Sequence, residues 1–288
     1  YIVMGYPRKI GQNIFNSAGV LHNNEVVLEY HKQELPNYEV FDEKRYFNPG
    51  KGPGILEIGD LKLALTVCED IWHTKAVRQA SRRGADLILN LNASPFHLEK
   101  INERKKLISN QASKYSLPIV YANQVGGQDE LVFDGTSMVM SELGTQVMQL
   151  AKFETDQKIA EFICEDGSNL KAINHEDIPE EDYLADVYQA LVLGAKDYIL
   201  KNNFPGALIG SSGGIDSAVT SALCAKTGVE TKLLIMPILQ NVAETERGVN
   251  HAYFLKQSYT NIEIVNIDII RKMKKMKGGG GGGGGGGG

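Results

Sequence analysis

One run of small and polar residues in the second half of the chain has the composition of a phosphate-binding loop. Residues 210–217 read Gly-Ser-Ser-Gly-Gly-Ile-Asp-Ser, between an apolar run at 205–209 and a stretch at 218–225 with apolar residues at helical spacing. A strand that feeds such a turn at a helix start directs unpaired N–H groups and the helix dipole at one point. The sequence therefore predicts an anion site, with a Gly/Ser turn that binds nothing as the alternative. No Gly-Lys-Ser/Thr ends the run, so it is not a Walker A loop.

A second set of residues has the chemistry of nucleophilic catalysis. Cys68 ends an apolar run and starts Cys-Glu-Asp-Ile-Trp, so we expect it on a sharp turn between a strand and a helix. A helix N-terminus favours the thiolate, whereas Glu69 and Asp70 oppose it. Lys32, just past a predicted strand, is the natural cationic partner. Either residue alone is more often an ordinary surface lysine or buried thiol, so only their joint context supports the hypothesis.

These segments resemble the nitrilase superfamily, whose amidases use a Glu-Lys-Cys triad on an αββα sandwich. The match is closer still to the glutaminase domain of the glutamine-dependent NAD⁺ synthetase family. The segments that carry it are Lys-Gln-Glu-Leu-Pro-Asn-Tyr at 32–38, Cys-Glu-Asp-Ile-Trp at 68–72 and Asn-Ala-Ser-Pro at 92–95. The run at 210–217 resembles the pyrophosphate-binding loop of ATP pyrophosphatases. A nitrilase-like half followed by such a loop is the architecture of that family, and the resemblance covers about residues 1–267.

The resemblance implies a role for each matching residue of the first half. Cys68 attacks the side-chain amide of glutamine and expels ammonia, and Lys32 stabilises the oxyanion together with the backbone N–H after Cys68. Glu43 orders the lysine. The positions that match those gripping the amino-acid end of glutamine are Tyr38, Ser94 and Lys100.

In the second half the resemblance implies an ATP site with Mg²⁺. The expected ATP-binding residues are Gly210, Ser211, Ser212, Gly213, Gly214, Ile215, Asp216 and Ser217. A carboxylate beside a phosphate loop repels ATP unless a divalent cation lies between them, so Asp216 is the expected Mg²⁺ ligand. A helix cap is the alternative role for Asp216.

The elements that must position these residues are those of an α/β protein. In the first half, strands are predicted at 13–21, 26–30, 61–67, 86–92, 119–123, 137–140 and 146–150, and helices at 71–83 and 99–116. This alternation favours a nitrilase-like αββα sandwich. In the second half, helices are predicted at 180–203 and 244–255, and strands at 205–209, 231–236 and 262–267. This pattern indicates the start of a doubly wound parallel sheet, of the adenine nucleotide α-hydrolase type, which binds ligands at the carboxyl ends of its strands.

We expect a nitrilase-like domain at 1–165, a linker at 166–183 and an ATP-pyrophosphatase-type domain at 184–270. Residues 271–288 end in an unbroken glycine tract, which cannot bury surface to offset its chain entropy, so we expect a disordered or artefactual tail. The abrupt start at Tyr1 and this tail predict a chain truncated at both ends. The general-base Glu of the family is then expected before Tyr1, and most of the dinucleotide site beyond residue 270.

The composition is that of an ordinary soluble globular protein. The 288 residues are 42% hydrophobic and 23% charged, and the formal charge of −5 gives no basic excess for nucleic acid or an anionic membrane. No apolar run approaches the roughly 20 residues that span a bilayer. Three cysteines do not predict a disulfide framework and favour the reducing cytoplasm. Cys164 and Cys224 are expected to be inert buried thiols.

The leading hypothesis is therefore a glutamine-hydrolysing, ATP-dependent ligase. Glutamine, ATP and nicotinic acid adenine dinucleotide are the expected substrates, Mg²⁺ the cofactor, and a homo-oligomer the expected full-length form. The alternatives are a nitrilase-type amidase fused to an unrelated nucleotide module and an inactive fragment that binds ATP. The leading hypothesis places Lys32 and Cys68 together at one rim of a sheet, in a pocket shared with Tyr38 and Ser94.

Overall fold

The computed structural model describes residues 1–38, 40–164, 170–173, 175–237 and 241–267. The chain divides into two compact units, which are described separately: residues 1–126 with 131–190, and residues 127–130 with 191–288. The predicted tail at 271–288 lies outside the described residues. The two units meet in sequence inside helix α4 (Tyr183–Lys201), and the predicted linker at 166–183 includes residues that are not described. The domain boundaries stay a prediction.

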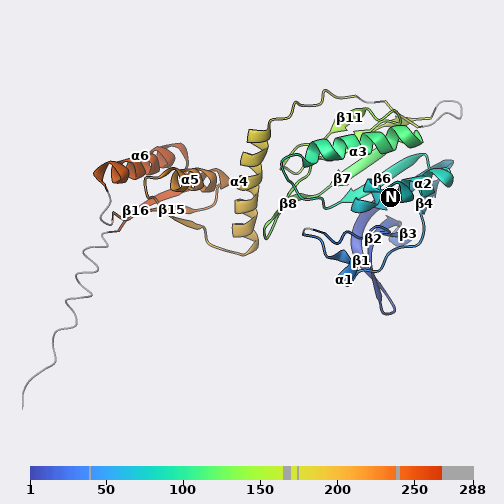
Figure 1. Ribbon diagram of the computed structural model, residues 1–288, viewed down its shortest axis with the longest axis horizontal. Coiled ribbons are helices and arrows are strands. Elements are labelled where there is room, and N and C mark those ends of the chain that lie inside the picture. Colours follow the sequence, from blue (N-terminus) through green and yellow to red (C-terminus); the bar gives the residue numbers. More distant parts are fainter. Residues whose placement is uncertain (39, 165–169, 174, 238–240, 268–288) are drawn as a thin grey trace, which may run out of the picture. The chain divides into compact units, whose positions relative to one another are not determined.

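The first unit is built on two main sheets and one layer of helices (Figure 1). The antiparallel three-stranded sheet has the order β1-β2-β3 and consists of Ile2–Ile10, Asn13–His22 and Glu25–His31. The six-stranded sheet has the order β11-β10-β7-β6-β5-β4 and consists of Gln146–Gln149, Met138–Met140, Ile119–Asn123, Leu87–Asn92, Leu61–Val67 and Gly54–Ile58. Its central strands β5, β6 and β7 run parallel, so the ends of β5 and β6 that carry Cys68 and Ser94 lie at one edge.

Apolar side chains hold these layers together. On one face of the large sheet, Ile88 and Ile119 pack with Val77 of α2 (Thr74–Arg82) and Ile108 of α3 (Lys100–Tyr115). The opposite face packs on the small sheet, with residues of β2 and β3 against β4 and β5: Ala18, Val20, Tyr30, Leu56, Leu65 and Val67. Strands covered on both faces are expected to be mainly apolar, as β5 and β6 are apart from Lys62, Thr66, Asn90 and Asn92. The predicted α/β, nitrilase-like class is confirmed.

The connection between β5 and α2 differs from the prediction. We expected one helix at 71–83, but a 3₁₀ turn, η1 (Cys68–Trp72), comes first and α2 begins at Thr74. The reason is local: the Asp70 carboxylate accepts the backbone N–H of Val67 and closes a tight turn at the end of the strand. Strand β4 and the hairpin of β8 (Val125–Gln128) and β9 (Leu131–Asp134) were not predicted.

The second unit is built on a parallel sheet of order β14-β15-β16: Ala207–Gly210, Thr231–Ile235 and Ile262–Asn266. Helix α5 (Ile215–Thr227) connects the first two strands and α6 (Val242–Ser258) the next two. Buried Leu233, Ile235, Ala252, Leu255 and Ile262 form the core. The predicted start of a parallel α/β domain is confirmed, and the loop at 210–217 lies at the carboxyl end of β14.

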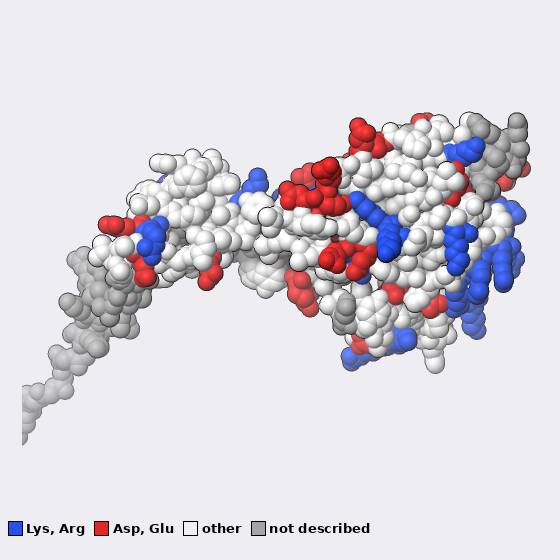
Figure 2. Space-filling model, turned by 45° about the horizontal axis from the view of Figure 1, so that its top comes forward, with Lys and Arg blue, Asp and Glu red and all other residues white. Residues whose placement is uncertain are grey.

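The surfaces of the two units differ in charge. On the face shown in Figure 2, charged side chains are denser on the first unit, whereas the visible surface of the second is mainly uncharged. Exposed apolar side chains of the second unit include Leu208 and Phe254, with exposed fractions of 67% and 63%. Among the described residues, no helix has both the length and the apolar character needed to cross a membrane.

Candidate active sites

Cys68 lies on a strained turn at the carboxyl end of β5. Its φ of 43° is in the left-handed region, which costs a residue other than glycine about 1–3 kcal/mol and persists only where the surroundings enforce it. The enforcing group is the buried carboxylate of Asp70, whose Oδ2 accepts the N–H of Val67 at 3.0 Å and the hydroxyl of Tyr30 at 2.8 Å. The turn therefore presents the thiol outside the sheet.

The same carboxylate fixes the lysine segment. Asp70 Oδ1 accepts the backbone N–H groups of Gln33 at 3.0 Å and Glu34 at 2.9 Å. Burial raises the pKa of the Asp70 carboxyl, and these hydrogen bonds oppose that rise. One buried side chain thus ties the residue after Lys32 to the turn that carries Cys68.

Lys32 is buried and paired with Glu43. Only 1% of the lysine side chain is exposed, and its Nζ donates to Glu43 Oε1 at 2.8 Å and Oε2 at 2.9 Å. Glu43 is the first residue of the short helix α1 (Glu43–Tyr46). Burying an ammonium is costly unless it is paired, so the two contacts with Glu43 offset that cost and fix the direction of the Lys32 side chain.

Two cavities meet at Cys68. One of about 630 Å³ is lined by Lys32, Glu43 and Cys68, so the predicted proximity of the lysine and the cysteine is confirmed. The other, of about 200 Å³, is lined by Cys68 together with Tyr38, Glu69, Trp72, Ser94 and Lys100. The prediction of one pocket shared by Lys32, Cys68, Tyr38 and Ser94 is therefore wrong: Cys68 lies between two cavities.

The smaller cavity contains groups of both charges. Glu69, which is mostly buried, accepts the hydroxyl of Tyr38 at 2.9 Å. Lys100 Nζ lies 4.3 Å from the centre of the Trp72 ring and 3.4 Å from a carboxylate oxygen of Glu103. The cavity can therefore accept a ligand that carries both an ammonium and a carboxylate.

The electrostatics of Cys68 differ from the sequence expectation. Burial raises the pKa of the thiol; Lys32 lowers it, and the carboxylates of Glu69 and Glu43 raise it. The backbone N–H of Ala93 donates to the sulfur and also lowers the pKa. Burial is the largest of these effects, so the pKa of the thiol is raised overall, and a base that accepts the thiol proton would favour the attack.

A buried polar network supports the Ser94 segment. Asn123 Oδ1 accepts the N–H of Ser94 at 2.9 Å, and Arg104 Nη2 donates to the carbonyl groups of Ser94 and Pro95, each at 3.1 Å. Arg104 and Asp134 form a fully buried bidentate ion pair with both contacts at 2.8 Å. The sequence analysis missed Arg104, Asn123 and Asp134, which lie on separate elements and carry no local motif.

In the second unit, the loop at 210–217 is closed by its own hydroxyl groups. The Oγ atoms of Ser212 and Ser217 are 2.9 Å apart, and Ser217 Oγ accepts the N–H of Ser212 at 3.2 Å. Ser211 Oγ instead donates to the carbonyl of Gly248 in α6, at 3.1 Å. Ser211 therefore bonds the loop to α6.

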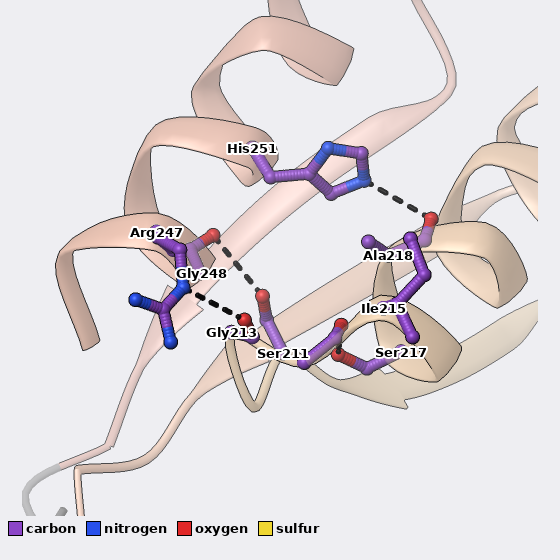
Figure 3. Close-up of a pocket in the computed structure, with 9 residues that line it drawn as sticks. Ser211, Gly213, Ile215, Ser217, Ala218, Arg247, Gly248 and His251 are labelled. Atoms are coloured by element: carbon purple, nitrogen blue, oxygen red, sulfur yellow. Dashed lines mark hydrogen bonds between the residues drawn. The ribbon is translucent and has the colours of Figure 1, made fainter. Parts of the chain in front are cut away.

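A cavity of about 330 Å³ lies between the loop and α6 (Figure 3). Five of the eight predicted ATP-binding residues line it: Ser211, Gly213, Gly214, Ile215 and Ser217. Gly210, Ser212 and Asp216 are not among its lining residues. Arg247 and His251 of α6 line it as well; the sequence analysis missed them because they follow the loop by about thirty positions.

Asp216 is exposed in the first turn of α5. The N-cap position belongs to Gly214, so the alternative that Asp216 caps the helix is wrong. No cluster of three His, Cys, Asp or Glu side chains suited to a metal occurs among the described residues. A single carboxylate beside a loop of backbone N–H groups fits a Mg²⁺ ion that takes its other ligands from phosphate oxygens and water.

The other two cysteines differ from each other. Cys164 is exposed, so its predicted burial is wrong: it follows the two-residue strand β12 (Phe162–Ile163), whose last residue is itself exposed. Cys224 on α5 is partly buried, and burial raises the pKa of its thiol.

Comparison with known proteins identifies the class. The carbon–nitrogen hydrolase family matches residues 1–169, and the NAD synthase family matches residues 187–279. Because the first match covers more than half of the 288 residues, the chain belongs to the carbon–nitrogen hydrolase family. Its second unit is the start of an NAD synthase domain.

The relatives that share both parts are glutamine-dependent NAD⁺ synthetases. That of Acinetobacter baylyi is 39% identical over 211 residues, which cover 73% of this chain and 38% of the relative. That of Aquifex aeolicus is 35% identical over 240 residues, covering 73% and 42%. A solved structure of the enzyme from Acinetobacter baumannii in complex with ADP matches with a TM-score of 0.84 and 35% identity, over 96% of this chain and 52% of that one. The predicted resemblance is confirmed, and the chain spans about half the length of these relatives or less.

Proposed function

We propose that this chain provides the glutaminase centre and the ATP-binding loop of a glutamine-dependent NAD⁺ synthetase. The observation that carries the proposal is the position of Cys68, between the buried Lys32–Glu43 pair and a cavity with both charges, in a chain that also has the loop at 210–217. The synthetase relatives share both features at the level of family domains.

At the first centre, the sulfur of Cys68 attacks the carbonyl carbon of the glutamine side-chain amide. The thiol proton passes to a carboxylate base, and the developing oxyanion is stabilised by Lys32 Nζ and the N–H of Glu69. The C–N bond breaks, ammonia leaves with a proton returned by the base, and a thioester remains. Water then hydrolyses the thioester to glutamate and the free thiol.

The smaller cavity holds the amino-acid end of glutamine. The Glu69 carboxylate, with the Tyr38 hydroxyl, suits the α-ammonium, and Lys100 suits the α-carboxylate. Ser94 lines the same cavity, in a segment that Arg104 and Asn123 hold in place. This arrangement selects an amino acid over a simple amide, because a simple amide brings no opposite charge to either Glu69 or Lys100.

At the second centre, the loop orients the triphosphate of ATP. The carboxylate oxygen of nicotinic acid adenine dinucleotide attacks the α-phosphorus and expels pyrophosphate; ammonia then displaces AMP and forms the amide of NAD⁺. Gly213 and Gly214 allow phosphate oxygens to approach the backbone N–H groups at the start of α5. Mg²⁺ held by Asp216 neutralises phosphate charge when it is bound.

Location and assembly are part of the proposal. The odd number of cysteines and the reducing environment that Cys68 needs favour the cytoplasm. We propose a homo-oligomer for the full-length form, which light scattering after size-exclusion chromatography would measure.

The proposal is tested by comparing NAD⁺ synthesis from glutamine with NAD⁺ synthesis from ammonium. The full-length form of the protein receives nicotinic acid adenine dinucleotide, Mg·ATP and either glutamine or ammonium, and NAD⁺ is quantified by chromatography. We expect Cys68→Ser to lose synthesis from glutamine and to keep synthesis from ammonium. Glutamine-supported synthesis that survives Cys68→Ser would refute the role of Cys68. Absence of NAD⁺ with both nitrogen sources would refute the ligase assignment for the full-length form.

A further inference from the structure

We propose that Arg247 of α6 is the cationic phosphate ligand of the loop at 210–217. The inference rests on the proposed role of that loop as an ATP site. It adds a residue that lies far from the loop in sequence and reaches it through the packing of α6.

The loop needs a cation that its own sequence lacks. A triphosphate carries several negative charges, and Asp216 adds another beside the loop. The helix N-terminus offers only about half a unit of positive charge. The loop contains no Lys or Arg, and among the described residues that line its cavity Arg247 is the one Lys or Arg.

Helix α6 lies directly on the loop, without side chains between the two backbones. Gly213 has a φ of 81°, and a Cβ atom there would lie 1.9 Å from the carbonyl oxygen of Glu244. A Cβ atom on Gly248 would lie 3.1 Å from the backbone nitrogen of Gly213. Together with the bond from Ser211 to the Gly248 carbonyl, these contacts fix α6 against the loop.

This contact places the guanidinium of Arg247 at the loop. Its Nε–H donates to the carbonyl of Gly213 at 3.3 Å (Figure 3). The two terminal nitrogen atoms are not used by that bond, and a planar guanidinium binds phosphate through two such donors at once. One turn later on the same helix, His251 Nε2 donates to the carbonyl of Ala218 in α5 at 3.1 Å. Helix α6 is therefore held on both sides of the cavity, which fixes the backbone that carries Arg247.

The expected ligand is the polyphosphate of the nucleotide, not its base or ribose. Arg247 should therefore contribute to the affinity for Mg·ATP and for inorganic pyrophosphate, and leave the affinity for adenosine unchanged. If Arg247 only shaped the loop through its bond to the Gly213 carbonyl, the charge of the replacement would not matter. Arg247→Gln and Arg247→Lys would then weaken phosphate binding equally.

The experiment compares Arg247→Gln, Arg247→Lys and the control Lys256→Ala in the whole chain. Lys256 is an exposed cation in the last turn of the same helix. Isothermal titration calorimetry with Mg·ATP, pyrophosphate and adenosine should show roughly 10- to 100-fold weaker binding of the two phosphate ligands to Arg247→Gln. Arg247→Lys should keep most of the affinity, and Lys256→Ala all of it. Thermal unfolding should remain at the wild-type temperature.

The outcomes separate this inference from the proposed function. If the wild-type chain binds Mg·ATP and Arg247→Gln binds it equally well, the inference is wrong and the ATP site stands. Equal losses in Arg247→Gln and Arg247→Lys would also overturn the charge role. If the wild-type chain binds neither Mg·ATP nor pyrophosphate, the proposed ATP site fails, and the inference fails with it.

Discussion

The two candidate sites are built in different ways. The Cys68 site brings together buried charged and polar groups from β3, α1, the β5–α2 connection and α3. Within it, the single side chain of Asp70 bonds to two segments about 36 positions apart. The phosphate loop is one continuous run whose backbone and hydroxyl groups bond mostly to one another. Acyl transfer needs charges in a dry, fixed arrangement, whereas phosphate binding needs exposed N–H groups at a helix start.

This difference predicts unequal sensitivity, and the largest effect is expected at the ion pair of Arg104 and Asp134. Asp134→Asn leaves the guanidinium buried without an opposite charge, and the loss of one partner of a buried pair costs about 3–5 kcal/mol. Chemical denaturation followed by circular dichroism should show this loss in the first unit. The double change Arg104→Met, Asp134→Leu removes both charges and should recover much of the stability. If Asp134→Asn has the same free energy of unfolding as the wild type, the Cys68 site does not depend on its buried charges in the way proposed.

A smaller effect is expected at Gly213, which the phosphate loop shares with α6. Gly213 and Gly228 have φ values of 81° and 78°, so alanine costs each about 1–2 kcal/mol from backbone strain. Only at Gly213 does the new Cβ meet the carbonyl of Glu244, which adds about 1–3 kcal/mol. Gly213→Ala should lose Mg·ATP binding in calorimetry, and Gly228→Ala, with open space around it, should keep it. Equal behaviour of the two variants would contradict the contact with α6.

The third prediction concerns the pH dependence of Cys68. Lys32 lowers the pKa of the thiol, so Lys32→Met should raise it further, and the unpaired Glu43 acts in the same direction. An opposite charge at this range shifts a pKa by about 1–3 units, so alkylation of Cys68 near pH 7.5 should slow by roughly tenfold or more. The difference should close as the pH rises above the pKa of both thiols. Lys62→Met, which removes a half-exposed lysine of β5, is the control. An alkylation rate of Cys68 that is unchanged in Lys32→Met would show that Lys32 does not act on the thiol.

The smallest effect on stability is expected at Asp216. The side chain is exposed and does not cap α5, so Asp216→Asn should change the free energy of unfolding by no more than about 0.5 kcal/mol. The Mg²⁺-dependent part of ATP binding should nevertheless be lost, because an amide is a weaker ligand than a carboxylate for this hard cation. Titrations with and without Mg²⁺ measure this directly. A large fall in stability with unchanged Mg²⁺ dependence would give Asp216 a structural role.

The sequence predicts best what is local along the chain. The strands that end at Cys68 and at the phosphate loop, and the helix that follows the loop, each have a periodicity or a motif within about fifteen residues. Strands 61–67 and 119–123 were predicted with the observed bounds. The 3₁₀ turn after Cys68 was not predicted, because it depends on Asp70, whose four hydrogen bonds reach Tyr30, Gln33 and Glu34 as well as Val67.

Contacts between distant segments could not be predicted. Asp70 was noted only as a charge opposed to the thiolate, yet the structure gives it the task of joining the lysine and cysteine segments. Arg104, Asn123 and Asp134 have ordinary sequence surroundings, and only folding brings them to the Ser94 segment. Arg247 was missed for the same reason, since nothing in the loop indicates which face of α6 covers it.

The central claim is that Cys68 is the nucleophile of a glutamine site, and the most direct test is its covalent modification. The chain is incubated with an electrophilic glutamine analogue, with or without excess glutamine, and digested for mass spectrometry. Cys164, which is exposed, and Cys224, which is partly buried, are internal controls in the same molecule. We expect the adduct on Cys68, its suppression by glutamine, and little label on the other two cysteines. An adduct that forms preferentially on Cys164 or Cys224, or a Cys68 adduct that glutamine does not suppress, would contradict the account.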